Sequence, residues 1–117
     1  MAAHRWLALA VGGACSLMPP PVMGANSAHE RLAAMSEVDR SDALALLVES
    51  SGQPCRTVAR TLFQGYDTSG HALWNVECGG GEAYLVLIMN DGRGSTRVLS
   101  CRRLAAVGSG RCFQQLD

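Results

Sequence analysis

The sequence has five cysteines, of which Cys15 lies in the N-terminal apolar stretch. The other four carry the most reactive chemistry: Cys55, Cys78, Cys101 and Cys112. They follow one another at intervals of 23, 23 and 11 residues, and no two of them form a Cys-x-x-Cys pair. Structural zinc sites, haem attachment sites and thioredoxin-type redox pairs all need ligands or thiols at short spacing. An even number of cysteines in a small exported domain is typical of a disulfide framework instead. We therefore predict that these cysteines form two disulfides.

The other residue types that could act as nucleophiles, bases or ligands do not form a recognisable site. His29 is expected in a frayed N-terminal region and His71 in a loop. Ser109 lacks the strand-turn-helix context of a hydrolase nucleophile, and no pair of carboxylates stands out. The sequence therefore predicts no catalytic residue, no metal ligand and no cofactor.

Two glycine-rich stretches are predicted to be turns. GRGST at 92–96 has neither the lysine nor the spacing of a phosphate-binding loop, and it joins two expected strands. GGGE at 79–82 offers glycines that permit the positive φ of a tight turn. We interpret both as hairpin connections.

Residues 1–25 have the features of a secretory signal peptide. A weakly basic start precedes an apolar run at 6–18, which is shorter than the roughly 20 residues that a membrane-spanning helix needs. The small residues Gly24 and Ala25 suit cleavage by a signal peptidase. We therefore expect a periplasmic or secreted protein in which 26–117 form a single small domain, with no membrane span after cleavage. An uncleaved anchor or a buried helix is the alternative.

The charge of the expected mature chain excludes two classes of partner. Residues 26–117 hold nine arginines, no lysine and ten acidic residues, so their net charge is −1. No basic field is present to attract nucleic acid, and no polybasic patch to bind anionic lipid. A local basic cluster is expected at one end of the sheet, formed by Arg93, Arg97, Arg102, Arg103 and Arg111. We interpret it as a solvated rim, with a site for an anion or an acidic peptide as the alternative.

The elements that must position these residues follow from a change in hydrophobic period. A helical period over the leucines of 41–51, with Asp39 or Ser41 as the cap, predicts a helix that a turn from His29 can precede. From Cys55 the period becomes two, which predicts strands at 55–65, 72–78, 83–90 and 96–101. Linkers of about five residues make neighbouring strands antiparallel. The predicted fold class is α+β: one N-terminal helix packed on a four-stranded antiparallel meander, with a short C-terminal helical turn.

Cross-strand pairing can be predicted for both central hairpins. Placing Phe63 opposite Trp74 also places Arg60 opposite Glu77, and both pairs are favourable. In the second hairpin we expect Trp74 opposite Ile88. One face of the sheet, the face that the helix should cover, would then hold Ala59, Phe63, Trp74, Val76, Tyr84, Val86 and Ile88.

The same order of strands selects one of the three possible disulfide pairings. The start of the first strand lies beside the end of the second, which brings Cys55 within reach of Cys78. Cys78 and Cys101 would be separated by a whole strand, or about 9.6 Å. A short helical turn after Cys101 can bring Cys112 back to it. We predict the pairs Cys55–Cys78 and Cys101–Cys112.

The opposite face of the sheet is unusually apolar. It carries a possible partner surface formed by Leu62, Leu73, Leu85, Leu87 and Met89. The third strand is therefore apolar on both sides, as a strand covered twice would be. Either the C-terminal segment 102–117 or a protein partner covers this face, and the sequence does not decide between them.

The strands and turns together resemble a family of exported bacterial domains. The pattern formed by Val58, Gly70, Trp74, Val76, Tyr84, Val86, Ile88, Asp91 and Gly92 resembles PepSY-type domains over roughly 40–101. The core formed by Trp74, Val76, Cys78, Gly81 and Tyr84 is also similar to small exported proteobacterial proteins of unknown function. The PepSY resemblance implies a non-catalytic role, in which the domain inhibits, chaperones or tunes another envelope protein. It supplies no catalytic residue that can be transferred to this chain.

These observations predict an exported, non-catalytic binding or accessory module that acts on another envelope protein. The alternative is a small periplasmic enzyme, a hydrolase or a thiol-redox enzyme with an unpaired cysteine. A purely structural envelope component would differ from the first prediction only in its partner.

Overall fold

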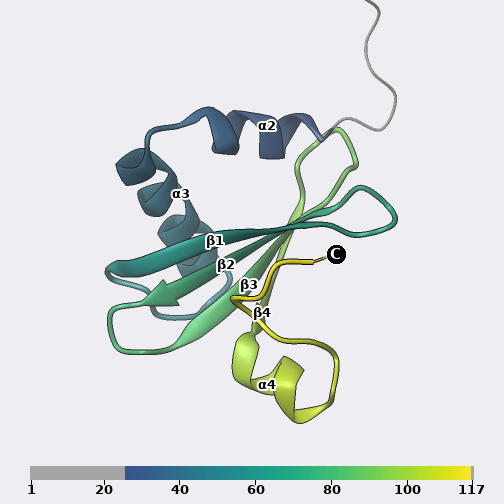
Figure 1. The fold of residues 1–117 in the computed structure, drawn as a ribbon. Helices are drawn as coiled ribbons and strands as arrows, with labels where there is room; N and C mark the ends of the chain where they lie inside the picture. The colour runs from purple at the N-terminus through teal and green to yellow at the C-terminus, as the bar shows by residue number, and fades with distance from the viewer. Residues whose placement is uncertain (1–25, 117) are drawn as a thin grey trace, which may run out of the picture.

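The computed structural model describes residues 26–116, so the predicted signal peptide lies outside the described residues. The elements follow in the order α2 (Ser27–Ala34), α3 (Glu37–Ser50), β1 (Val58–Tyr66), β2 (Ala72–Cys78), β3 (Ala83–Ile88), β4 (Thr96–Ser100) and α4 (Cys101–Ala106). The four strands form one antiparallel sheet in the order β1-β2-β3-β4. The predicted α+β meander is therefore confirmed (Figure 1).

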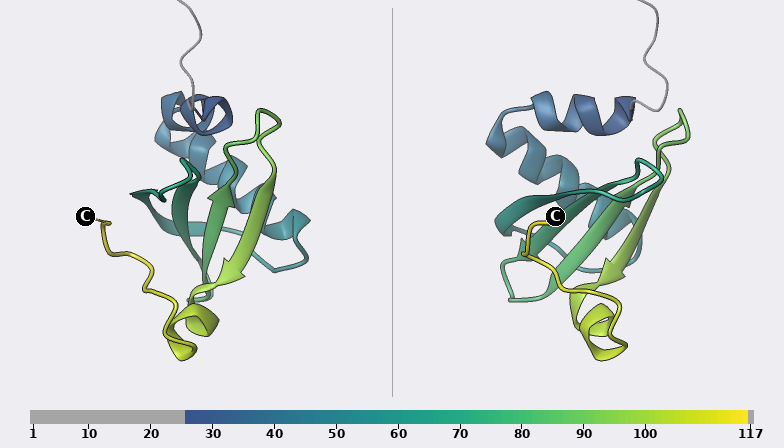
Figure 2. Two further views of the ribbon diagram at one scale, coloured as in Figure 1. Left: turned by 90° about the vertical axis from the view of Figure 1, so that its right-hand side faces the viewer. Right: turned by 45° about the vertical axis from the view of Figure 1, so that its right-hand side comes forward.

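Helices α2 and α3 lie on one face of the sheet, α4 lies at the end of β4, and the chain after α4 turns back across the other face (Figures 1 and 2). The N-terminal segment forms two helices where the sequence predicted one principal helix. Asn26 caps α2 by accepting a hydrogen bond from the amide of His29, and Ser36 caps α3 by accepting from Asp39. Ser36 is the better cap because Asp39, three residues later, then lies in the first turn at the positive end of the helix. No helix of residues 26–116 is both long enough and apolar enough to cross a membrane.

The predicted pairing is confirmed in the first hairpin and wrong in the second. Phe63 lies opposite Trp74 and Arg60 opposite Glu77. In the second hairpin Trp74 lies opposite Val86, which is a shift of two residues from the expected Ile88. A shift of two keeps every side chain on its expected face, because successive strand residues alternate between faces. The alternation of apolar residues therefore agrees equally well with both registers.

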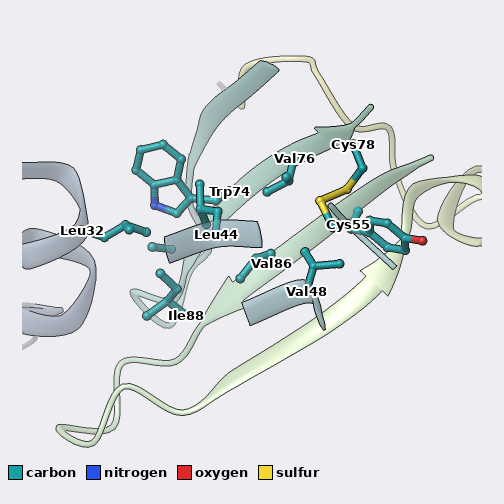
Figure 3. Packing of buried hydrophobic residues seen from close by; sticks show 11 residues of the cluster. Leu32, Leu44, Val48, Cys55, Trp74, Val76, Cys78, Val86 and Ile88 are labelled. Atoms are coloured by element: carbon teal, nitrogen blue, oxygen red, sulfur yellow. A yellow bond between two sulfur atoms is a disulfide. The ribbon is translucent and has the colours of Figure 1, made fainter. Parts of the chain in front are cut away.

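The core lies between the helices and the sheet face that they cover (Figure 3). Leu44 and Val48 of α3 have no exposed surface, and they pack on a cluster that includes Val76 and Val86. Ala59 was expected on this face and is instead exposed. A β-bulge between Val58 and Arg60 reverses the alternation locally, so that Val58 packs against the core in place of Ala59.

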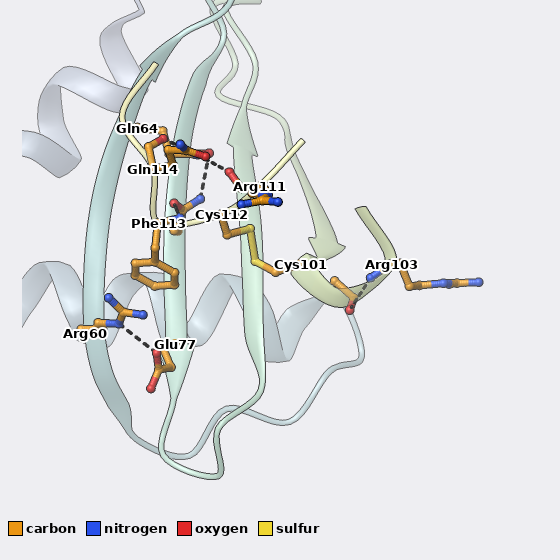
Figure 4. Close-up of a disulfide and its surroundings, with 11 residues drawn as sticks. Arg60, Gln64, Glu77, Cys101, Arg103, Arg111, Cys112, Phe113 and Gln114 are labelled. Atoms are coloured by element: carbon orange, nitrogen blue, oxygen red, sulfur yellow. Dashed lines mark hydrogen bonds and ion pairs between the residues drawn. A yellow bond between two sulfur atoms is a disulfide. The ribbon is translucent and has the colours of Figure 1, made fainter. Parts of the chain in front are cut away.

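Both predicted disulfides are present. Cys55 and Cys78 are joined with a Cα–Cα distance of 5.2 Å, and Cys101 and Cys112 with one of 5.8 Å. The first bridge lies within the core, where its two cysteines are 1% and 4% exposed. The second lies at the surface and joins the start of α4 to the C-terminal segment (Figure 4). The two bridges thus act on different parts of the molecule.

We expect the core bridge to contribute more to stability than the surface bridge. The double variant Cys55→Ala/Cys78→Ala should lower the free energy of unfolding by about 3 kcal/mol, since the bridge closes a loop of 23 residues and its sulfur atoms are buried. Replacing Cys101 and Cys112 in the same way, which opens a loop of 11 residues, should cost less. Chemical denaturation of the two variants measures the difference. A larger loss from the surface pair would contradict this assignment.

Candidate functional site

None of the four cysteines that follow the predicted signal peptide has a free thiol. All four are disulfide-bonded, so a thiol-redox mechanism has no unpaired cysteine within residues 26–116. No three His, Cys, Asp or Glu side chains of the same residues lie close enough together to hold a metal ion. His71 lies in the predicted loop, where its Nδ1 accepts a hydrogen bond of 2.8 Å from the amide of Asn90. This hydrogen bond gives His71 a structural role in the loop.

The GRGST segment is a hairpin loop, as predicted, and a side chain already occupies its amides. The backbone N–H groups of Arg93, Gly94 and Ser95 donate to the Asp91 carboxylate at distances of 2.8–3.3 Å. Hydrogen bonds from Ser95, assisted by these amides, lower the pKa of Asp91 to about 2. The amides of this loop therefore bind the Asp91 carboxylate of the loop itself, and Asp91 has a structural role.

His29 is buried, which corrects the expectation that it lies in a frayed segment. It is 3% exposed because α2 packs it against the sheet. Its Nδ1 accepts a hydrogen bond of 2.9 Å from Trp74 Nε1, and its ring stacks on Phe63 at 4.4 Å between centroids. Tyr66 contacts the imidazole edge-on at 5.2 Å. The histidine thus anchors α2 to β1 and β2 in its neutral form, because protonation would remove the acceptor that Trp74 uses.

We expect protonation of His29 to destabilise the fold. Burial lowers its pKa from 6.5, and the nearby Glu30 carboxylate opposes this effect only in part. The unfolded chain then binds more protons than the folded chain below about pH 6.5, so the free energy of unfolding should decrease as pH falls through this range.

Denaturation at a series of pH values measures this effect. His29→Gln should abolish this component of the pH dependence, whereas the matched variant His71→Gln should retain it. An unchanged pH profile in His29→Gln would show that other groups cause the decrease.

The C-terminal segment is held on the outer face, the sheet face opposite α2 and α3, by two buried amide side chains (Figure 4). Asn75 of β2 is fully buried; its Nδ2 donates to Gln64 Oε1 at 2.9 Å, and its Oδ1 accepts from the amide of Phe113. Gln64 of β1 donates to the carbonyls of Arg111 and Gln114 at 2.8 and 2.9 Å. The polar groups of this face are therefore satisfied by the backbone of the C-terminal segment.

Further contacts fix the same segment over β1. The amide of Leu116 donates to the Gln64 carbonyl at 3.0 Å, and Gln115 Nε2 donates to the Phe63 carbonyl at 2.8 Å. The Arg60 guanidinium lies 3.8 Å from the ring centre of Phe113 and also pairs with Glu77 at 2.8 Å. These contacts all reach β1 or β2, so the segment is fastened to that side of the outer face.

The five residues of the predicted partner surface share this outer face but differ in exposure. Leu85 is buried, at 8% exposed. The other four, Leu62, Leu73, Leu87 and Met89, are half-buried. Leu99 of β4 lies opposite Leu85 on the same face and is 38% exposed. Whether a partner binds these residues stays a prediction.

A groove of about 610 Å³ lies where β4 meets α4, on the side of the sheet away from β1. It is lined by Gln53, Val98, Leu99, Ser100, Arg103, Leu104 and Val107. Val107 in this lining is 73% exposed. Of the five arginines expected in one cluster, Arg103 lines this groove, whereas Arg93 lies in the loop between β3 and β4, at the opposite end of β4. The expected cluster at one end of the sheet is therefore wrong. Sequence reasoning missed the groove because the position of α4 depends on the Cys101–Cys112 bridge.

We expect the Asn75 amide to be the main fastening of the C-terminal segment. Asn75→Leu should lower the free energy of unfolding by about 2 kcal/mol, because it leaves the Phe113 backbone N–H and the side-chain Oε1 of Gln64 unpaired in a buried site. Hydrogen exchange at the Phe113 amide should become faster. In the matched variant Gln115→Ala, whose side chain is exposed, stability should change by less than about 0.5 kcal/mol. Unchanged protection of Phe113 in Asn75→Leu would contradict the assignment.

Comparison with known proteins found no matching family model, no similar curated protein and no similar solved structure. The resemblance to PepSY-type domains accordingly stays a prediction.

Proposed function

We propose that this protein is an exported, non-catalytic accessory module that binds another protein of the cell envelope. The observation that carries the proposal is the partly covered outer face. The C-terminal segment is fastened over β1 and β2, while Leu99 on β4 stays 38% exposed beside the groove at α4.

The chemistry of this surface favours a protein partner. Single exposed apolar residues are common on any protein, but a contiguous group beside a groove marks an interaction site more often. Leu99 and Val107 line the groove together, and Leu87 lies on the neighbouring strand β3, on the same face as Leu99. Burial of these side chains against a partner would contribute about 25 cal/mol for each Å² of apolar surface removed from water.

Two features support an envelope location. Two disulfides in so small a domain are stable in an oxidising compartment such as the periplasm. The predicted signal peptide would deliver the chain to that compartment. An accessory role further agrees with the role that the PepSY resemblance implies.

Site-specific photo-cross-linking in cells that export the protein tests the proposal. A photoreactive residue placed at Leu99 should give an adduct of defined mass with one envelope protein. The matched control is Leu46 of α3, which is 63% exposed and belongs to a helix that covers the other face. Equal labelling from both positions, or no adduct from Leu87 and Leu99, would contradict the proposal.

A further inference from the structure

The outer edge of β4 presents backbone groups that have no hydrogen-bond partner within residues 26–116. The amide of Met89 donates to the Ser95 carbonyl at 2.8 Å. With the register of the two strands, this bond shows which residues of β4 point their backbone groups toward β3 and which point them away. In an antiparallel pair every second residue bonds the neighbouring strand, so residues 95, 97 and 99 bond β3. The N–H and C=O groups of Thr96 and Val98, and the N–H of Ser100, therefore point away from the sheet.

The two edges of the sheet differ in their capacity to accept another strand. β1 is irregular, with bulges at Val58/Arg60 and Phe63/Gly65, and the C-terminal segment bonds its carbonyls at the second bulge. Bulges and covering segments are the usual means by which proteins block an edge. β4 has a regular register with β3 and has β3 as its one strand neighbour within residues 26–116. The open edge is therefore β4.

Charge identifies the kind of strand that this edge would accept. Residues 96–103 read TRVLSCRR, with three arginines and no acidic residue. Arg102 pairs with Glu82 at 3.3 Å, whereas the side chains of Arg97 and Arg103 form no ion pair within residues 26–116. Arg103 also lines the groove with Val98. An acidic segment would thus gain charge pairs that the chain itself does not provide.

A second copy of the chain would fit this edge poorly. Pairing β4 with β4 across a two-fold axis would bring Arg97 and Arg103 of both copies to one seam. Positive charges gathered at one interface without acidic partners repel one another. The same arginines that favour an acidic occupant therefore disfavour self-association.

We propose that an extended, acidic segment of a partner protein adds to β4 as a fifth strand. Its backbone pairs with Thr96, Val98 and Ser100, its acidic side chains meet Arg97 and Arg103, and its apolar side chains enter the groove at Val98 and Val107. Strand addition of this kind takes affinity from main-chain hydrogen bonds and specificity from alternate side-chain pockets. This inference deepens the proposed function and rests on it.

Titration of the native, disulfide-bonded chain with synthetic peptides tests the inference. The probe is an eight-residue peptide of alternating valine and glutamate, observed through the backbone amide signals in NMR spectra. The amides of Thr96, Val98 and Ser100 should shift on binding. The same peptide with alternate backbone nitrogens methylated should bind about tenfold more weakly, because it loses two or three hydrogen bonds. A valine–lysine peptide should not bind.

Two protein variants separate charge from backbone pairing. Arg97→Glu should weaken binding of the valine–glutamate peptide about tenfold, while the matched variant Arg31→Glu, exposed on α2, should bind as the native protein does. Val98→Pro removes an outward N–H and should abolish the amide shifts. If that variant does not fold, the methylated peptide gives the same test without altering the protein.

The possible results discriminate between the two proposals. Equal affinity of the methylated peptide, shifts confined to Leu85 and Leu87, or no binding at all would overturn strand addition at β4. A dimer of the free chain that buries β4 would overturn it as well. The peptide results do not bear on cross-linking from Leu99, so the proposed function can stand when the strand-addition inference fails. A dimer that buries β4 would also cover Leu99 and would contradict both proposals.

Discussion

The arrangement of the outer face depends on one buried amide. Asn75 lies at the centre of β2 with no exposed surface, on the side of the sheet that the helices do not cover. A buried amide without partners costs free energy comparable to several of the weak contacts around it. Its partners are Gln64 and the backbone of Phe113, so β1, β2 and the C-terminal segment are joined through a single side chain. The position of α4 follows, because the Cys101–Cys112 bridge sets where the segment begins its return.

Because the C-terminal segment is held by hydrogen bonds to a few polar groups, it covers the outer face only in part. The C-terminal segment meets the sheet mainly through hydrogen bonds to β1 and β2, which lie at one side of the meander. One edge of the sheet is consequently closed by bulges and by the segment, and the other edge is left regular and open. The asymmetry between the two edges, more than the apolar character of β3 alone, gives the molecule one side suited to binding.

The sequence was sufficient for the parts of the fold that depend on side-chain alternation and on cysteine spacing. Arg60 and Glu77, with Phe63 and Trp74, fixed the first hairpin, because two distinct pairs agree on one register. The second hairpin offered only apolar pairs, and these fit two registers equally well. The bulge at Val58 exchanged that residue with Ala59 because bulges carry no signal in a period-two pattern.

The candidate site was less predictable because its contacts involve the backbone. Gln64 donates to the carbonyls of Arg111 and Gln114, and any residue types in the C-terminal segment would offer those acceptors. His29 was misplaced for a related reason: its burial depends on Trp74, 45 residues away, and on the path of α2 across the sheet. Long-range pairing of one polar atom with another leaves no periodic trace in a sequence. Positions such as Asn75, a lone amide inside a strand of apolar neighbours, are therefore where sequence analysis of small sheets should look for a segment that folds back.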